Sequence, residues 1–315
     1  MSEFRHMMPA GKALFKDRHT TKANDLLQSY TSGMENEFGM AGVPLSKPSI
    51  SHSGASFAPS AIREALKSFT TYSGEEGMDL TERIIDFGDI YMSPTDIIGN
   101  QERIVEGLTD VFATKAAKNW LVLGGDHSIS YSSIKAFAGG KKVGVIQFDA
   151  HHDLRNTEDG GPTNGTPFRR LLEDNIIKGE HLSQIGIRDF TNAAAYDRYA
   201  SEQGVTVYTM ADVDRLTITK ILDEEIQRLA EITDVIYLSV DMDVLDQAFA
   251  PGCPAIGPGG MDSKTLLKGI LFASHYEKIQ AMDIVEIDPS IDFRNMTSRL
   301  AAYVILQFMK GKKNR

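Results

Sequence analysis

Short runs of consecutive apolar residues recur along the chain from about residue 84 onward. They predict seven strands, at 84–87, 120–123, 143–148, 182–187, 205–208, 235–240 and 280–287. Most of these runs are apolar at successive rather than alternate positions, which indicates strands covered on both faces. A parallel sheet between two layers of helices has strands of this kind.

Segments with the 3.6-residue apolar period of amphipathic helices separate these runs. They predict helices at 101–117, 130–138, 167–172, 193–203, 218–230, 263–275 and 297–309. The alternation of strand and helix is typical of a doubly wound α/β fold. No repeat or shift in composition marks an internal boundary. We therefore predict a single α/β domain over residues 36–315, preceded by an N-terminal extension of residues 1–35.

Composition narrows the class of protein. With 315 residues, 42% of them hydrophobic, the chain can bury a substantial core. The one cysteine, Cys253, excludes an internal disulfide and a cysteine-rich metal site, and it fits a reducing compartment. The N-terminal stretch lacks the pattern of a signal peptide, and no apolar run approaches the roughly 18 residues that span a bilayer. We expect a cytoplasmic protein without a membrane partner.

The charge balance bears on partners. A formal net charge of −10 argues against a nucleic-acid partner, because phosphate binding needs a concentrated basic surface. The short basic stretch KGKKNR at 310–315 is expected to be a solvated end. A small-molecule substrate is the expected partner.

Acidic and imidazole side chains follow three of the predicted strands directly. The stretches are GGDHSIS after 120–123, DAHHD after 143–148 and DMDVLD after 235–240. In an extended chain, alternate side chains point the same way, and parallel strands end at one edge of their sheet, where ligands bind. The candidate residues are therefore expected to lie together: His127, Asp149, His151, Asp153, Asp241 and Asp243.

Four carboxylates and two imidazoles in one place predict a metal centre. They would repel, and several acids would take up protons, unless cations lay between them. Six ligands exceed the needs of one ion, so two ions sharing bridging carboxylates are expected. Oxygen-rich ligands with some imidazole and no thiolate favour two Mn²⁺ ions, with Zn²⁺, Fe²⁺ or Ni²⁺ less favoured. A single Asp or His at a strand end is commonly a helix cap, but three clusters at equivalent strand ends are not.

The stretches GGDHS, DAHHD and SVDMDVLD resemble, in order, the three metal-binding signatures of the ureohydrolases, the superfamily of arginase and agmatinase. The segments GASFAPSAIREAL and DFGDI are also similar to segments of that family. The resemblance implies a three-layer α/β/α sandwich with an eight-stranded parallel sheet, and a homo-oligomer, either a trimer or a hexamer. It also implies that Asp149 and Asp241 bridge two manganese ions, one held in addition by His127 and Asp153 and the other by His151 and Asp243.

The same resemblance implies a hydrolytic mechanism. Two cations lower the pKa of a bridging water, and the resulting hydroxide attacks an amidine or guanidine carbon. Asp153 is the candidate for carrying a proton to the leaving nitrogen. Glu286, in DIVEIDP at the end of the last predicted strand, would receive the amidinium group of the substrate. Asp153 and Glu286 are thus the predicted catalytic residues.

Departures from the family pattern concern the substrate tail. Arginases have an asparagine where this chain has Arg155, a histidine of an HG segment where it has Asn164, and an acid where it has Thr191. An added cation and a lost acid favour an anionic tail without an ammonium group. DAHHDLR and NGTPFR also resemble the formimidoylglutamase branch. The predicted reaction is therefore hydrolysis of N-formimidoyl-L-glutamate to L-glutamate and formamide, with Arg155 and Asn164 contacting the substrate and with Arg169 and Arg294 as weaker candidates for its second carboxylate.

Other functions remain open at this point. Within the enzyme class, agmatinase, arginase or a guanidino-acid hydrolase would release urea instead of formamide. A metal-free binding relative could keep the fold alone, although none of the six expected ligands is replaced. A deacetylase of similar fold has one zinc ion and no use for paired bridging acids. His152 is expected to point away from the metal ligands and to pack against a neighbouring element.

Overall fold

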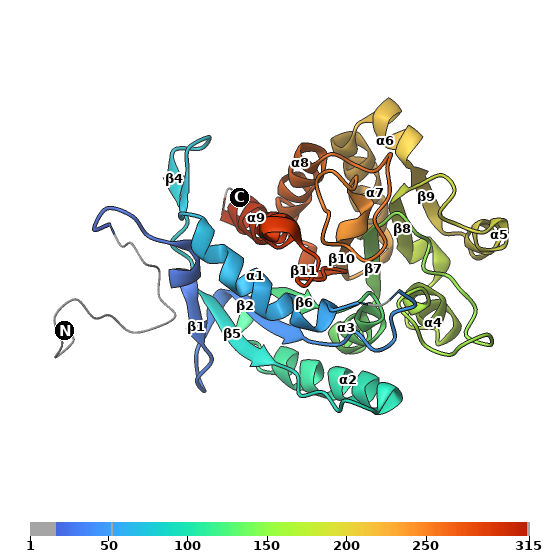
Figure 1. The fold of residues 1–315 in the computed structure, drawn as a ribbon, viewed down its shortest axis with the longest axis horizontal. Coiled ribbons are helices and arrows are strands. Elements are labelled where there is room, and N and C mark those ends of the chain that lie inside the picture. The colour runs from blue at the N-terminus through green and yellow to red at the C-terminus, as the bar shows by residue number, and fades with distance from the viewer. Residues whose placement is uncertain (1–16, 52, 314–315) are drawn as a thin grey trace.

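The computed structural model describes residues 17–51 and 53–313 and shows a parallel sheet between helices (Figure 1). Within the described residues the central sheet has nine strands in the order β1-β5-β2-β6-β11-β10-β7-β8-β9. All its neighbouring strands pair in parallel. The strands are β1 (Leu27–Ser29), β2 (Asn36–Val43), β5 (Ile84–Asp89), β6 (Ala117–Gly124), β7 (Val143–Phe148), β8 (Leu182–Ile187), β9 (Thr206–Thr209), β10 (Val235–Asp241) and β11 (Ile279–Val285). A small antiparallel hairpin joins β3 (Tyr72–Ser73) and β4 (Met78–Asp79).

Helices cover both faces of the sheet, as Figure 1 shows. One layer contains α1 (Ala58–Ala65), α7 (Ile218–Ile232), α8 (Ser263–Ser274) and α9 (Met296–Lys313), and the other contains α2 (Ile97–Ala113), α3 (Ile129–Ala138) and α4 (Pro167–Glu173). Two further helices, α5 (Ala194–Gln203) and α6 (Met210–Leu216), flank β9. Every residue of β7 and of β10 is buried, as strands covered on both faces require. The predicted fold class is confirmed, with one strand more than the expected eight.

The first two strands escaped prediction for physical reasons. β1 has only three residues and forms the sheet edge beside β5, so no periodicity can reveal it. β2 contains two glycines, which weaken a strand signal. The packing explains one of them, since a Cβ on Gly39 would lie 2.4 Å from the Trp120 ring of β6. Glycine allows this indole to lie against the backbone of the neighbouring strand.

Both ends of the helix predicted at 101–117 are wrong. The helix predicted at 101–117 begins earlier, where the Asp96 side chain accepts a hydrogen bond from the Gly99 amide, and it ends at Ala113. Lys115 then adopts a φ of 53° and Ala117 opens β6. The described part of the basic stretch, residues 310–313, is also less solvated than predicted, because α9 continues to Lys313 and Lys312 is buried, with its Nζ donating to two carbonyl groups. Residues 314–315 lie outside the described residues.

The N-terminal boundary stays a prediction. β1 precedes the proposed domain start at residue 36 and still pairs with β5 of the central sheet. Residues 1–16, which form the first half of the proposed extension, lie outside the described residues.

Four neighbouring strands position the site. The order β6-β11-β10-β7 places together the strands that lead into the candidate residues. Their ends are in register, with Leu123 beside Ile284, Asp241 beside Val285 and Val240 beside Phe148. The charged side chains that follow therefore meet at one edge of the sheet.

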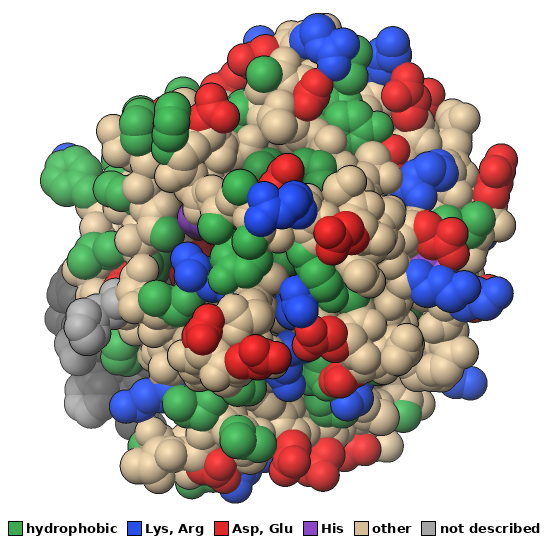
Figure 2. Space-filling view, turned by 90° about the vertical axis from the view of Figure 1, so that its right-hand side faces the viewer, with side chains coloured by type: hydrophobic (Ala, Val, Ile, Leu, Met, Phe, Trp, Pro, Cys, Tyr) green, Lys and Arg blue, Asp and Glu red, His purple; other side chains and the backbone are tan. Residues whose placement is uncertain are grey.

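The distribution of surface charge and the polarity of the helices bear on possible partners. Acidic and basic side chains are interspersed over the face seen in Figure 2. Among the described residues, no helix is both long enough and apolar enough to cross a membrane.

Candidate metal centre

Two aspartates use the same local turn to enter the site. Asp149 follows β7, and its Oδ1 accepts the backbone N–H of His151 at 2.6 Å. Asp241 ends β10, and its Oδ1 accepts the backbone N–H of Asp243 at 2.7 Å. Such turns between residues i and i+2 are common for aspartate. In both residues they fix the carboxylate plane and leave Oδ2 to face the site.

His127 lies at the centre of three carboxylates. Its Nδ1 is 3.1 Å from Asp149 Oδ2, 2.9 Å from Asp153 Oδ2 and 3.1 Å from Asp241 Oδ2. Asp153 reaches this position through a left-handed backbone conformation with φ of 51°. The prediction that strand alternation would align the residues after β7 is therefore wrong in its mechanism, because the chain turns after Phe148. The turn nevertheless brings the predicted residues together.

The protonation of His127 fits a metal ligand. Its Nε2 lies 2.9 Å from Ser239 Oγ, and this hydroxyl donates its own proton to Asp283 at 2.8 Å. Ser239 can therefore only accept from His127, which fixes the proton on Nε2. Nδ1 is buried and has no hydrogen-bond partner among the described residues. Three carboxylate oxygens around Nδ1 require positive charge at this point, which a proton supplies in the metal-free protein and a metal ion would supply in its place, so these residues fit a metal ion.

A second group adjoins the first and shares Asp149. His151 Nδ1 is 3.0 Å from Asp243 Oδ2 and 3.4 Å from Asp149 Oδ1. Among the described residues, two groups have ligand atoms close enough for one ion: His127, Asp149 and Asp241, and Asp149, His151 and Asp243. The six predicted ligands thus lie together, and Asp149 belongs to both groups, while its role as a metal bridge stays a prediction. The bridging role of Asp241 stays a prediction.

The electrostatics of the cluster favour added positive charge. Burial opposes protonation of His127, yet its carboxylate neighbours raise its pKa well above the ordinary value. The charge of Asp243 raises the pKa of His151 to about 12. Burial, with further acids nearby, raises the pKa of Asp153 to about 6 and that of Asp241 well above its usual range. Without metal, protons on the two imidazoles and on Asp241 therefore supply the positive charge that the cluster needs.

Glu286 projects into the site from the end of β11. Its backbone has a φ of 59°, a conformation that residues other than glycine seldom adopt outside functional sites. Its Oε1 accepts the His127 backbone N–H at 2.8 Å, whereas its buried Oε2 has no partner among the described residues. Burial and the nearby Asp126 raise the pKa of Glu286 to about 8. An unpaired, buried carboxylate oxygen is a site for a cationic group.

Asn164 and Arg155, the two residues predicted to contact the substrate tail, have different surroundings. Asn164 donates from Nδ2 to Glu286 Oε1 at 3.1 Å, and its Oδ1 accepts the Ile50 N–H at 3.0 Å. Its Nδ2 thus holds Glu286, its Oδ1 is occupied by Ile50, and a contact to substrate stays a prediction. Arg155 is exposed, forms no ion pair with a described carboxylate, and has its guanidinium 5.9 Å from the centre of the Tyr196 ring.

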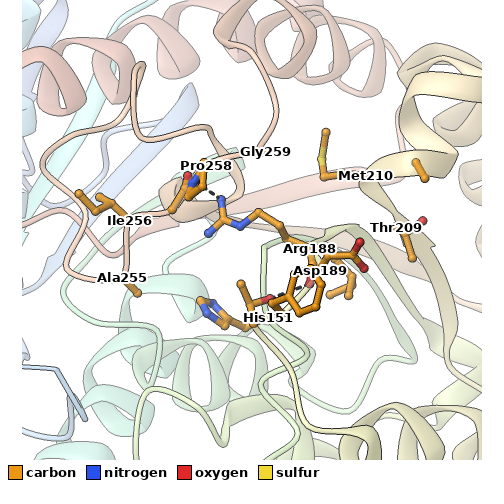
Figure 3. A pocket seen from close by; sticks show the side chains of 14 residues that line it. His151, Arg188, Asp189, Thr209, Met210, Ala255, Ile256, Pro258 and Gly259 are labelled. Carbon is orange, nitrogen blue, oxygen red and sulfur yellow. Dashed lines mark hydrogen bonds between the residues drawn. The ribbon is translucent and has the colours of Figure 1, made fainter.

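An open cavity of about 620 Å³ lies beside His151 (Figure 3). Arg188 and the loop from Ala255 to Gly259 form part of its wall. Arg188 is buried, and its Nη1 donates to the carbonyl oxygens of Asp243 and Gly257. Within the described residues Arg188 pairs with no carboxylate. A buried cation therefore borders the cavity beside the candidate metal-binding group that contains His151.

Sequence reasoning missed two residues of this site. Arg188 follows β8 at the same sheet edge, and its position alone could have indicated it. Gln147 lies inside the apolar run of β7, and its Nε2 donates to Asp149 Oδ2 at 2.6 Å. A buried amide within a continuous apolar run was the signal available for Gln147.

Comparison with known proteins gives one consistent result. The model of the Arginase family matches residues 36–310. The formimidoylglutamase of Halalkalibacterium halodurans is 59% identical over 304 residues, covering 95% of each chain. The crystal structure of formimidoylglutamase from Bacillus subtilis is similar with a TM-score of 0.94, at 48% identity and with coverage of 98% of this chain and 96% of that one. The proclavaminate amidino hydrolase from Streptomyces clavuligerus is similar with a TM-score of 0.81, at 28% identity and with coverage of 93% and 97%.

Proposed function

The chain belongs to the arginase family, and from this membership we propose that it hydrolyses N-formimidoyl-L-glutamate to L-glutamate and formamide. The observation that carries the proposal is the buried, unpaired Oε2 of Glu286 beside two candidate metal groups. Relatives named formimidoylglutamase, at 59% and 48% identity over nearly the whole chain, support the choice of substrate.

The proposed cofactor is a pair of Mn²⁺ ions. Carboxylate oxygens with two imidazole nitrogens and no thiolate suit this ion. His127, Asp149, Asp153 and Asp241 would hold one ion, and Asp149, His151, Asp241 and Asp243 the other. Such a pair supplies a water nucleophile at neutral pH. A metal-free binding relative is the remote alternative, and the unpaired Nδ1 of His127 argues against it.

Protein side chains would orient the substrate and move its protons. The formamidine group is a cation at neutral pH, and Glu286 Oε2 would accept a hydrogen bond from its nitrogen. This contact turns the amidine carbon toward the candidate metal groups. Water adds to that carbon, the bond to the glutamate nitrogen breaks, and Asp153 would deliver a proton to the departing amine.

Two arginines would receive the carboxylates of the substrate tail. Arg155 is exposed near the site, whereas Arg188 lies in the cavity wall, and neither has an acidic partner among the described residues. Arg169 is a poorer candidate, because it pairs with Glu173 and stacks 3.6 Å over the Tyr199 ring. Thr191 offers no acid for a substrate ammonium, and its hydroxyl donates to the carbonyl oxygens of Ala150 and Arg188.

A substrate panel on manganese-loaded enzyme tests the proposal. Formimidoylglutamate should release formamide, whereas agmatine, arginine and guanidino acids should release little urea. The similarity to an amidino hydrolase makes a guanidino-acid hydrolase the second candidate. Urea release from a guanidino acid, without formamide from formimidoylglutamate, would favour that candidate. Protein that binds no manganese and stays inactive would favour the binding relative.

The same proposal bears on the pathway, the cellular compartment and the oligomeric state of the enzyme. Formimidoylglutamate belongs to histidine degradation, a cytoplasmic process, and we assign the protein to it. We further propose that the chain forms a homo-oligomer, a trimer or a hexamer. Mass measurement in solution tests the oligomeric state.

A further inference from the structure

A chain of buried amides connects Asp149 to His152. Gln147 Nε2 donates to Asp149 Oδ2 at 2.6 Å and to the His151 carbonyl at 3.2 Å. Gln184 Nε2, on the neighbouring strand β8, donates to Gln147 Oε1 at 2.7 Å. Gln184 Oε1 in turn lies 2.7 Å from His152 Nδ1. Gln147 and Gln184 are fully buried and His152 is almost so.

Each bond in this chain has one possible direction. Backbone carbonyl oxygens only accept hydrogen bonds, and they fix both amides: Gln147 Nε2 also donates to the His151 carbonyl, and Gln184 Nε2 donates to the His152 carbonyl at 2.7 Å. Gln147 must therefore turn its NH₂ group toward Asp149 and its carbonyl toward Gln184. Gln184 must then donate to Gln147 and accept from His152. The proton of His152 consequently lies on Nδ1.

We propose that Gln147, Gln184 and His152 form a positioning relay that fixes the Oδ2 atom of Asp149, the carboxylate shared by both metal groups. None of the three belongs to the predicted ligand set. The inference rests on the proposed metal centre. It explains why DAHHD has a second histidine, whose ring contacts Gln184 on β8 and not the metal groups.

Energetics favour positioning over simple packing. Two buried amides cost several kcal/mol unless all their polar atoms are paired. Apolar side chains of the same size would fill this space without that cost. The relay also grips Asp149 at Oδ2, the oxygen 3.1 Å from His127 Nδ1, whereas Oδ1 is already held by the His151 amide. Loss of the relay would thus weaken metal binding by the group that contains His127 more than by the group that contains His151.

Manganese titration of purified variants tests the relay, read as the dissociation constant by calorimetry and electron paramagnetic resonance. Gln147→Met should raise the dissociation constant about 10-fold to 100-fold, the usual effect of losing a partner of a metal ligand. Gln184→Met should act in the same direction but less. The double variant should be no worse than Gln147→Met alone, because Gln184 acts only through Gln147.

Variants of His152 separate relay from packing. His152→Asn keeps an N–H near the position of Nδ1 and should retain the affinity of the native protein, whereas His152→Leu should match Gln184→Met. Gln227→Met, on the exposed face of α7, is the matched control. If Gln147→Met does not fold, Gln184→Glu carries the test, since a carboxylate cannot donate to Gln147 and must force its amide to turn over.

Distinct outcomes overturn the relay and the proposed function. The relay fails if folded Gln147→Met and Gln184→Met bind manganese within about twofold of the native protein, or if their effects add. The proposed metal centre fails instead if the native protein itself binds no manganese.

Discussion

At the scale of single residues, the two oxygens of each carboxylate at the site have different partners. Asp149 and Asp241 each commit Oδ1 to a local amide and turn Oδ2 to His127. Glu286 commits Oε1 to the His127 amide and to Asn164 and leaves Oε2 open. One oxygen therefore sets the orientation, and the other remains available for a cation. Neutral amides hold these carboxylates without competing for that cation.

Arg155 allows a test of how the substrate tail is held. Arg155→Ala should raise the KM for formimidoylglutamate roughly 10-fold to 150-fold, because charged hydrogen bonds contribute about 1.5–3 kcal/mol. The kcat should change little, since the side chain does not contact the reacting carbon. Steady-state kinetics measure both values.

A shortened formamidine without carboxylates serves as the control substrate, because native enzyme and Arg155→Ala should turn it over equally. Unchanged KM for formimidoylglutamate would remove Arg155 from the tail site. Arg188→Lys would then be the next variant, because it keeps the charge in the cavity wall.

At the scale of elements, close backbone approach fixes the loop that carries His127. Gly125 follows β6, and its N–H donates to the Val43 carbonyl while its own carbonyl accepts the Glu286 N–H. A Cβ at Gly125 would lie 1.9 Å from the Leu45 carbonyl oxygen, so only glycine fits without a shift of the backbone. The loops after β2, β6 and β11 thus form one unit.

Gly125→Ala should disturb both stability and metal binding. The clash is with backbone, which cannot rotate away, so the free energy of unfolding should fall by about 2 kcal/mol or more. The displaced loop moves His127, so manganese affinity should fall as well. Gly74→Ala is a suitable control, because its Cβ would meet only a side-chain atom at 3.9 Å. Equal stability of both variants by chemical denaturation would contradict this account of the loop.

How well a feature could be predicted from the sequence depended on how far apart in the chain its interacting residues lie. The strands at 143–148 and 182–187 coincide with β7 and β8, because continuous burial leaves a direct record in the sequence. The meeting of the six candidate ligands could also be predicted, since parallel strands end at one edge. The turn at Asp153, the pairing of Asn164 with Glu286 and the cavity position of Arg188 depend on contacts between distant segments. No local pattern encodes such contacts.

At the scale of the whole molecule, the charged cluster makes the free energy of unfolding depend on pH and on bound metal. Burial and Asp126 raise the pKa of Glu286 from 4.5 to about 8, so between these values the unfolded chain releases a proton that the folded chain keeps. Asp243 raises the pKa of His151 from 6.5 to about 12, with the same consequence above pH 6.5. Both groups therefore lower the stability of the metal-free protein as pH rises from 6.5 to 8.

Thermal unfolding at pH 6 and pH 8, with chelator or with excess Mn²⁺, checks this linkage. Each proton changes the free energy of unfolding by about 1.4 kcal/mol per pH unit, so the metal-free Tm should fall clearly toward pH 8. Manganese binds deprotonated histidine and carboxylate, so its stabilisation should be larger at pH 8 than at pH 6. Glu286→Gln removes one titrating group and should make the metal-free decline shallower. Parallel pH curves with and without manganese would show that the ions bind away from these side chains, because a metal that displaces their protons must change the slope.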